Sequence, residues 1–124
     1  MRTLRALPFV VLFGVTACGA QLPRTASQDA FALQSTFVGL LKAENHYAEL
    51  PRCSPLQHAP CSDQHVVNAM SNRSDQAQVA VDQAVAAARD TAKSENDRAK
   101  ANLTAQHAVD ALRQIIDASQ AQKV

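Results

Sequence analysis

Three cysteines and four histidines are the side chains of this chain whose types could carry out chemistry. Cys53 and Cys61 have His58 and His65 beside them, and two thiolates with two imidazoles could supply the four ligands of a structural zinc ion. Paired cysteines in such sites are usually about two to four residues apart, whereas seven residues separate this pair. The spacing therefore argues against a metal site, and we expect no bound metal or cofactor.

No other group of residues has the spacing of a catalytic site. His46 and His107 lie in separate parts of the chain, and the glycines are too scattered to form a phosphate-binding loop. No serine lies in the strand-turn-helix elbow that exposes a nucleophile. The acidic residues alternate with basic ones at helical spacing, which is typical of a solvated helix face. We therefore predict no catalytic residues and a protein that is not an enzyme.

The segment that ends at Cys18 has the layout of an export signal. Arg2 and Arg5 precede an apolar run over residues 6–17, and small residues come directly before the cysteine in Val15-Thr16-Ala17-Cys18. At 12 residues the run is shorter than the roughly 20 that a membrane-spanning helix needs. The segment resembles the signal peptide and lipobox of a bacterial lipoprotein. An ordinary secretory signal, cleaved near Ala20, and an uncleaved anchor are the alternatives.

The resemblance implies the chemistry and the location of Cys18. Residues 1–17 would be removed, and Cys18 would become an acylated N-terminus that ties the protein to a membrane. Gly19 stands where lipoproteins retained in the inner membrane often have Asp. The resemblance therefore implies the periplasmic face of the outer membrane, with the inner membrane as the alternative. Several acyl chains would hold the protein firmly, since each buried CH2 contributes about 0.8 kcal/mol.

Export also bears on the two other cysteines. Because the lipobox takes Cys18, Cys53 and Cys61 remain as an even pair in a compartment that oxidises thiols, and the resemblance implies a disulfide between them. Free thiols are the alternative. Three prolines lie between residues 51 and 60, which excludes the interior of a helix or a strand. We expect a loop closed by the disulfide.

Length and charge limit what the exported part can be. The 107 residues from Cys18 to Val124 suit one small domain. Without Arg2 and Arg5, 10 of the 12 basic side chains remain beside 11 acidic ones, and the two signs are interspersed. No basic patch for nucleic acid is present. Few aromatic residues are available for a core, so we expect helices that pack closely through Ala, Val and Leu.

The first helix is predicted over residues 28–49, after a flexible tether at 18–27. Ser27 is the predicted N-cap, and the predicted apolar face includes Phe37 and Val38. Gly39 costs helix stability, which predicts the close approach of a neighbouring helix at this point. Pro51 ends the helix.

Beyond Cys61 the chain has no Gly or Pro, which demands helix. Ser62 is the predicted cap of a second helix that runs on through the polar residues 71–75, with a kink or a separate cap there as the alternative. A turn at 92–95 is predicted, because Ser94 and Asp97 have the spacing of a capping pair. A third helix follows. Without that turn, residues 62–119 would form one rod and favour a coiled-coil oligomer.

Alanines dominate the middle of the predicted second helix, at Ala84, Ala86, Ala87 and Ala88. They predict either the tight seam of an intramolecular bundle, which we favour, or a face that awaits a partner helix. The fold class is therefore all-α: a small antiparallel helical hairpin or three-helix bundle over residues 28–124, with a disulfide-closed loop, preceded by a cleaved signal helix.

The function expected from these features is that of a scaffold or adaptor in the cell envelope. The stretches Leu50-Pro51-Arg52-Cys53 and Cys61-Ser62-Asp63, followed by Ala-rich helices, resemble small bacterial lipoproteins, some of them associated with phage regions. A phage-related role in lysis or exclusion, or an enzyme that acts on peptidoglycan, is the alternative. Expected partners are the membrane, through Cys18, and a helical protein or a second copy; no nucleic acid or small-molecule substrate is expected.

Overall fold

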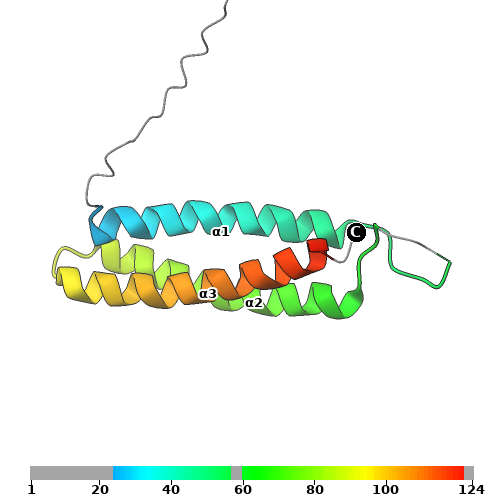
Figure 1. The fold of residues 1–124 in the computed structure, drawn as a ribbon. Helices are drawn as coiled ribbons and strands as arrows, with labels where there is room; N and C mark the ends of the chain where they lie inside the picture. Colours follow the sequence, from blue (N-terminus) through cyan, green and yellow to red (C-terminus); the bar gives the residue numbers. More distant parts are fainter. Residues whose placement is uncertain (1–23, 57–59, 122–124) are drawn as a thin grey trace, which may run out of the picture.

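The structure, a computed structural model, describes residues 24–56 and 60–121. It contains three helices, α1 (Ala26–Ala48), α2 (Gln64–Arg89) and α3 (Glu95–Ala121). The helices lie side by side, each packed against the other two, and α2 runs antiparallel to α1 and α3 (Figure 1). The all-α prediction is confirmed, in its three-helix form. None of the helices in these ranges is long and apolar enough to be a membrane span.

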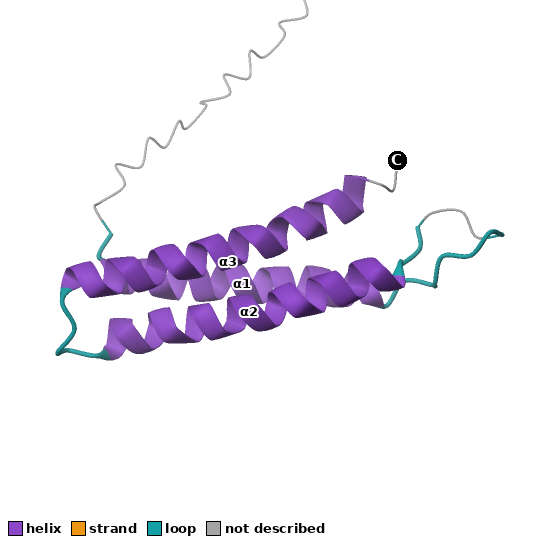
Figure 2. Ribbon diagram, turned by 90° about the horizontal axis from the view of Figure 1, so that it is seen from below, coloured by secondary structure: helices purple, strands orange, loops and turns teal. Residues whose placement is uncertain are grey.

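The second and third helices are separate, as predicted, and the alternative of one rod over residues 62–119 is wrong. α2 continues unbroken through the polar residues 71–75 and ends at its cap Asp90. Figure 2 shows the short turn that returns the chain into α3. Within the turn Asp90 Oδ1 accepts from the backbone N–H of Ala92 at 2.9 Å. Arg98 donates to the Asp90 carbonyl at 2.8 Å, which ties the two helix ends together.

Ser94 and Asp97 begin α3 with the predicted capping interaction. The Ser94 hydroxyl oxygen accepts from the Asp97 backbone N–H at 3.1 Å and donates to the Asp97 carboxylate at 2.7 Å. The hydrogen bond from the Ser94 side chain, helped by Lys100 and Lys93, holds the pKa of Asp97 below its ordinary value. The helix start is therefore fixed by local sequence, which explains why it could be predicted.

The caps of the first two helices differ from the prediction by one or two residues. Thr25, not Ser27, caps α1, because Thr25 and Gln28 form a capping box with both reciprocal hydrogen bonds. Asp63, not Ser62, caps α2, and its carboxylate accepts from the N–H groups of the second and third residues of the helix. The hydroxyls of Ser27 and Ser62 instead bond to carbonyls of Ala88 and Leu50, far along the chain.

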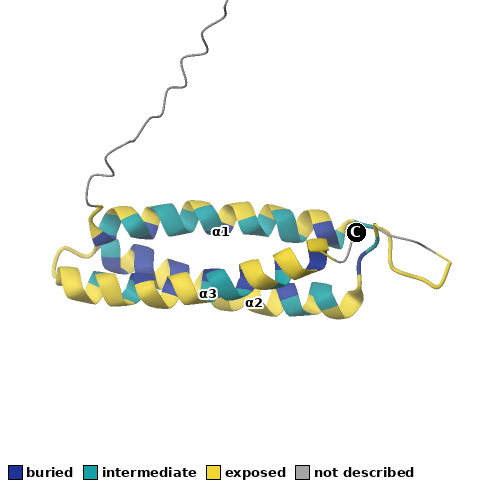
Figure 3. Cartoon of the chain, in the orientation of Figure 1, coloured by how far each residue is buried: buried dark blue, intermediate teal, exposed yellow. Residues whose placement is uncertain are grey.

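The core lies on the axis between the three helices and is built mostly of small and aliphatic side chains (Figure 3). Its buried members follow steps of three and four along each helix, which places them on one face. These residues include Ala30, Phe37, Met70, Ala77, Val81, Ala84, Ala105, Val109, Leu112 and Ile116. Val38 was wrongly predicted to join this face and is 46% exposed, because the face of α1 passes through Leu33, Phe37 and Leu40 instead.

The alanines of α2 belong to this interior. Ala84 and Ala87 are buried, and Ala88 is half-buried against the core. Only Ala86 of the four points to solvent. The interpretation as an intramolecular seam is therefore confirmed, because small side chains here allow the helices to approach each other closely.

Gly39 does not mark a helix contact, and that prediction is wrong. Gly39 is exposed, and a methyl group added at its Cα would meet no atom within 4 Å. Because the residue is inside α1, where glycine costs about 0.5–1 kcal/mol relative to alanine, Gly39→Ala is expected to raise the free energy of unfolding by that amount. Urea denaturation measures the gain. The reverse change at an exposed position, Ala86→Gly in α2, should lower the free energy of unfolding by a similar amount. A Gly39→Ala protein that is less stable than the wild type would contradict the conclusion that no helix packs against Gly39.

Candidate functional site

The loop between α1 and α2 brings together two of the residues singled out in the sequence. Cys53 and Cys61 form a disulfide, and their Cα atoms are 4.9 Å apart. The loop projects beyond the end of the bundle where α1 ends and α2 begins (Figures 1 and 2). Residues 51–56 are exposed along their whole length, and the side chain of Leu56 is 94% exposed. The disulfide therefore closes a loop whose first arm, residues 53–56, is exposed to solvent.

Hydrogen bonds close the base of this loop independently of the disulfide. The backbone N–H of Ser62 donates to the Pro51 carbonyl at 2.8 Å, and that of Cys53 donates to the Ser62 carbonyl at 3.1 Å. These bonds form an isolated parallel bridge between Arg52 and Ser62. The buried Ser62 hydroxyl donates to the Leu50 carbonyl at 2.9 Å. Ser62, predicted as a helix cap, is thus the residue that joins the two arms of the loop.

Tyr47 links the loop to the bundle, and the sequence interpretation missed it. Its ring is buried in the last turn of α1, and its hydroxyl oxygen accepts from the backbone N–H of Asp63 at 3.0 Å. Asp63 is the cap of α2, so the end of α1 positions the start of α2. A signal was available: Tyr47 lies ten residues after Phe37, at the three-and-four spacing of the α1 core face.

The Tyr47 hydroxyl offers a direct test of this junction. Tyr47→Phe keeps the buried ring and leaves the Asp63 N–H without the hydroxyl acceptor, so we expect the free energy of unfolding to fall by about 1 kcal/mol. Chemical denaturation measures the loss, and amide hydrogen exchange should show faster exchange at Asp63. Ser35→Ala is the control, since the Ser35 hydroxyl is exposed and donates to the Phe31 carbonyl of the same helix. Unchanged exchange at Asp63 would contradict the role given to Tyr47.

Of the two histidines considered as metal ligands, only His65 lies within the described residues. His65 is exposed in the first turn of α2, and His58 lies outside the described residues. His46 and His107 are exposed on α1 and α3. Within residues 24–56 and 60–121, no three His, Cys, Asp or Glu side chains are placed to hold a metal ion. Both loop sulfurs are bonded to each other, which leaves neither as a thiolate ligand.

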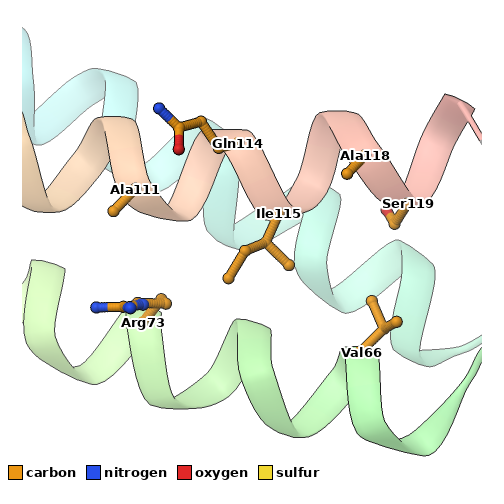
Figure 4. Close-up of a pocket in the computed structure, with 7 residues that line it drawn as sticks. All are labelled: Val66, Arg73, Ala111, Gln114, Ile115, Ala118 and Ser119. Atoms are coloured by element: carbon orange, nitrogen blue, oxygen red, sulfur yellow. The ribbon is translucent and has the colours of Figure 1, made fainter.

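A groove of about 320 Å3 lies between α2 and α3 at the same end of the bundle as the loop (Figure 4). Ile115 extends from α3 toward α2, between Val66 and Arg73 of that helix. The other lining residues are mostly small: Ala111, Gln114, Ala118 and Ser119. The Arg73 guanidinium donates to Gln76 at 2.9 Å, and no ion pair of Arg73 is present among the described residues. The groove offers apolar contact beside one positive charge.

A polar pair interrupts the apolar core near this end. Ser74 is buried on the inner face of α2, and its hydroxyl donates to the carboxylate of Glu44 on α1. Glu44 is half-buried and lies between Phe37 and Tyr47 on the core face of α1. Because a carboxylate at such a position needs a hydrogen-bond partner, the pair fixes the register of α1 against α2.

The opposite end of the bundle holds the start of α1, which follows the predicted tether. Cys18, the predicted lipidation site, lies outside the described residues. Glu95 Oε1 accepts from the backbone N–H of Ala26 at 2.7 Å, and Asn102 donates to the Ala26 carbonyl at 2.6 Å. α1 begins at Ala26, two residues before the predicted start of the helical domain. Both groups that hold Ala26 come from α3, about 70 residues along the chain.

In comparison with known proteins, no family model, curated protein or solved structure matches this chain.

Proposed function

We propose that this chain is an exported bacterial lipoprotein whose helical bundle acts as a non-enzymatic scaffold or adaptor in the cell envelope. Acyl chains on Cys18 would anchor it to the periplasmic face of the outer membrane. The observation that carries the proposal is the sequence of residues 1–18, where two arginines, an apolar run and the small residues before Cys18 follow one another at the spacing of a lipoprotein signal. Gly19 favours the outer membrane over the inner one.

The disulfide supports export. Cys53 is exposed at the base of the loop, where reducing agents of a cytosol would reach it. Structural disulfides persist mainly in oxidising compartments, which in bacteria means the periplasm and beyond. An exposed bridge in a small domain is therefore typical of a protein that has left the cytosol.

The shape of the bundle supports the role of an adaptor. A scaffold needs exposed surfaces of defined geometry, and the loop and the groove between α2 and α3 both lie at one end of the molecule. The groove could take an apolar side chain of a partner helix, with Arg73 beside it for an acidic group. The disulfide and the hydrogen-bonded loop base reduce the conformational entropy that a partner would have to remove on binding.

The anchor is tested by metabolic labelling with radioactive palmitate. The wild-type protein should incorporate label and fractionate with membranes, and Cys18→Ser should lose both. The matched control is the double variant Cys53→Ser/Cys61→Ser, which removes two other cysteines and should keep the label. Undiminished labelling of Cys18→Ser, or an unprocessed wild-type chain in the cytosolic fraction, would overturn the proposal.

The adaptor role is tested by site-specific photocross-linking in intact cells. A photoreactive residue at Gln114, which lines the groove, should give one discrete adduct of defined mass. The same residue at Gln78, exposed in the middle of α2, should not give that adduct. Identical adduct patterns from both positions, or none from either, would argue against a partner at the groove.

A further inference from the structure

We infer that the anchored protein has a preferred polarity: the α2–α3 turn lies nearer to the lipid headgroups, and the disulfide loop and the groove form its membrane-distal end. This inference rests on the proposed acylation of Cys18. It adds which surface of the bundle meets the bilayer and which surface is left for partners. Two features of the chain carry it, namely how the start of α1 is held and how little chain separates it from Cys18.

The start of α1 is held firmly against the α2–α3 turn. The Ala26 backbone is bonded on both sides, through its N–H to Glu95 and through its carbonyl to Asn102, and Asn102 is buried. Ser27 adds a hydrogen bond of 3.3 Å from its hydroxyl to the Ala88 carbonyl of α2. The point where the chain leaves the bundle is therefore part of its rigid end, next to the turn between Arg89 and Glu95.

The chain between the anchor and this point is short. Cys18 and Thr25 are seven residues apart, and seven residues span at most about 25 Å when fully extended. The 23 residues of α1 cover about 34 Å at a rise of 1.5 Å per residue. Because the tether is shorter than the helix, the turn stays close to the headgroups, while the loop at the far end of α1 can swing away from them.

The side of the bundle gives the bilayer no apolar face to hold it flat. A helix that lies in the membrane interface needs a continuous apolar face. The large exposed apolar residues of the described helices are Phe31, Val38, Val79 and Leu103, and they come from all three helices. The Arg89 guanidinium lies over the Phe31 ring, 5.9 Å from its centre, and covers part of it. Nothing therefore holds the loop end of the bundle at the bilayer surface, and on average the tethered end lies nearer to the membrane.

The charges at the turn are compatible with a position near headgroups. Lys93 and Lys100 lie close to Asp97, and Asp90 caps α2 beside them. Because both signs are present, the turn is neither driven from an anionic surface nor bound to it by charge alone. The polarity comes from the tether and the hydrogen bonds that hold α1, and it should not depend on the lipid headgroup.

Energy transfer to the membrane surface tests the polarity. The acylated full protein has no free thiol when Cys18 carries lipid and Cys53 is bonded to Cys61, so one introduced cysteine can be labelled specifically. Lys93→Cys places a donor dye at the turn, and Glu49→Cys places it at the end of α1 beside the loop; both positions are exposed. The protein is reconstituted in phosphatidylethanolamine and phosphatidylglycerol vesicles with an acceptor dye on a fraction of the headgroups.

Transfer from position 93 should be about two-fold or more stronger than transfer from position 49, because about 34 Å of helix separates the ends. Equal transfer, or stronger transfer from position 49, would overturn the polarity. The proposed anchor is tested separately, by flotation of the same vesicles and by the mass of the acylated protein. A protein that does not float with the vesicles refutes the anchor. A protein that floats but shows equal transfer from the two positions refutes only the polarity. Asn102→Ala, which frees the Ala26 carbonyl, should reduce the difference between the two positions.

Discussion

Leu112→Ala is expected to lower the free energy of unfolding by about 3 kcal/mol, the largest effect that we predict for a single substitution. Leu112 is fully buried in the C-terminal half of α3, where it packs in the core shared by all three helices. Truncation removes three side-chain carbons and leaves a cavity that the surrounding helices can fill only in part. A domain with so few aromatic core residues has little stability to spare, so the loss should be a large fraction of the total.

The control for Leu112 lies on the same helix. Leu103→Ala makes the same chemical change at a residue that is 56% exposed, and we expect a change of no more than about 0.5 kcal/mol. Urea denaturation followed by circular dichroism measures both variants. If both variants lost the same free energy of unfolding, the loss would come from helix propensity and not from burial in the core.

Removal of the disulfide is the second large effect. The double variant Cys53→Ser/Cys61→Ser should lose about 2.5 kcal/mol, the chain-entropy cost of closing a ring of nine residues in the unfolded state. The native helices should persist, because the Ser62 and Tyr47 hydrogen bonds close the base of the loop without the sulfurs. We therefore expect an unchanged far-ultraviolet circular dichroism spectrum together with a lower urea midpoint.

A second pair of measurements distinguishes the effect of breaking the disulfide from the effect of replacing the cysteine side chains. The wild-type protein with a reductant should match the double variant, and Ser54→Ala, a change at an exposed position between the two cysteines, should match the wild type without reductant. Loss of helical signal on reduction would show that the bundle needs the bridge to fold, contrary to the role given to the loop base.

Helix positions were largely accessible from the sequence, because local signals determine them. Pro51 and the two other prolines of the loop exclude helix there, and the absence of Gly and Pro after the loop demands it. The turn at Ser94 was predictable because a capping hydroxyl and its partner lie within three residues. The unbroken passage of α2 through residues 71–75 was also predicted, since those polar residues form only the solvent side of a helix apart from Ser74.

The misplaced caps came from choosing the wrong one of two nearby capping side chains, and the Gly39 error from expecting a helix contact that does not exist. Ser27 and Ser62 have good capping side chains, but their hydroxyls bond to Ala88 and Leu50, and neighbouring residues cap the helices instead. Gly39 suggested a helix contact because a glycine inside a helix is costly, yet no neighbour lies near it. Local spacing carries no information on such partners, because the hydrogen bonds join residues 12 to 61 positions apart.

The sequence by itself determined the all-α class and the proline-rich loop, since each depends on neighbouring residues. The tertiary structure decided how these parts are joined: Tyr47 and Ser62 close the base of the disulfide loop, and Glu95 and Asn102 fix the start of α1 against α3. It also decided that the groove and the loop share one end of the bundle while α1 begins at the other. The reason is that these groups meet only when the three helices pack together. Apolar residues at steps of three and four show which face of a helix is buried, but they do not show which residues of the other helices that face contacts.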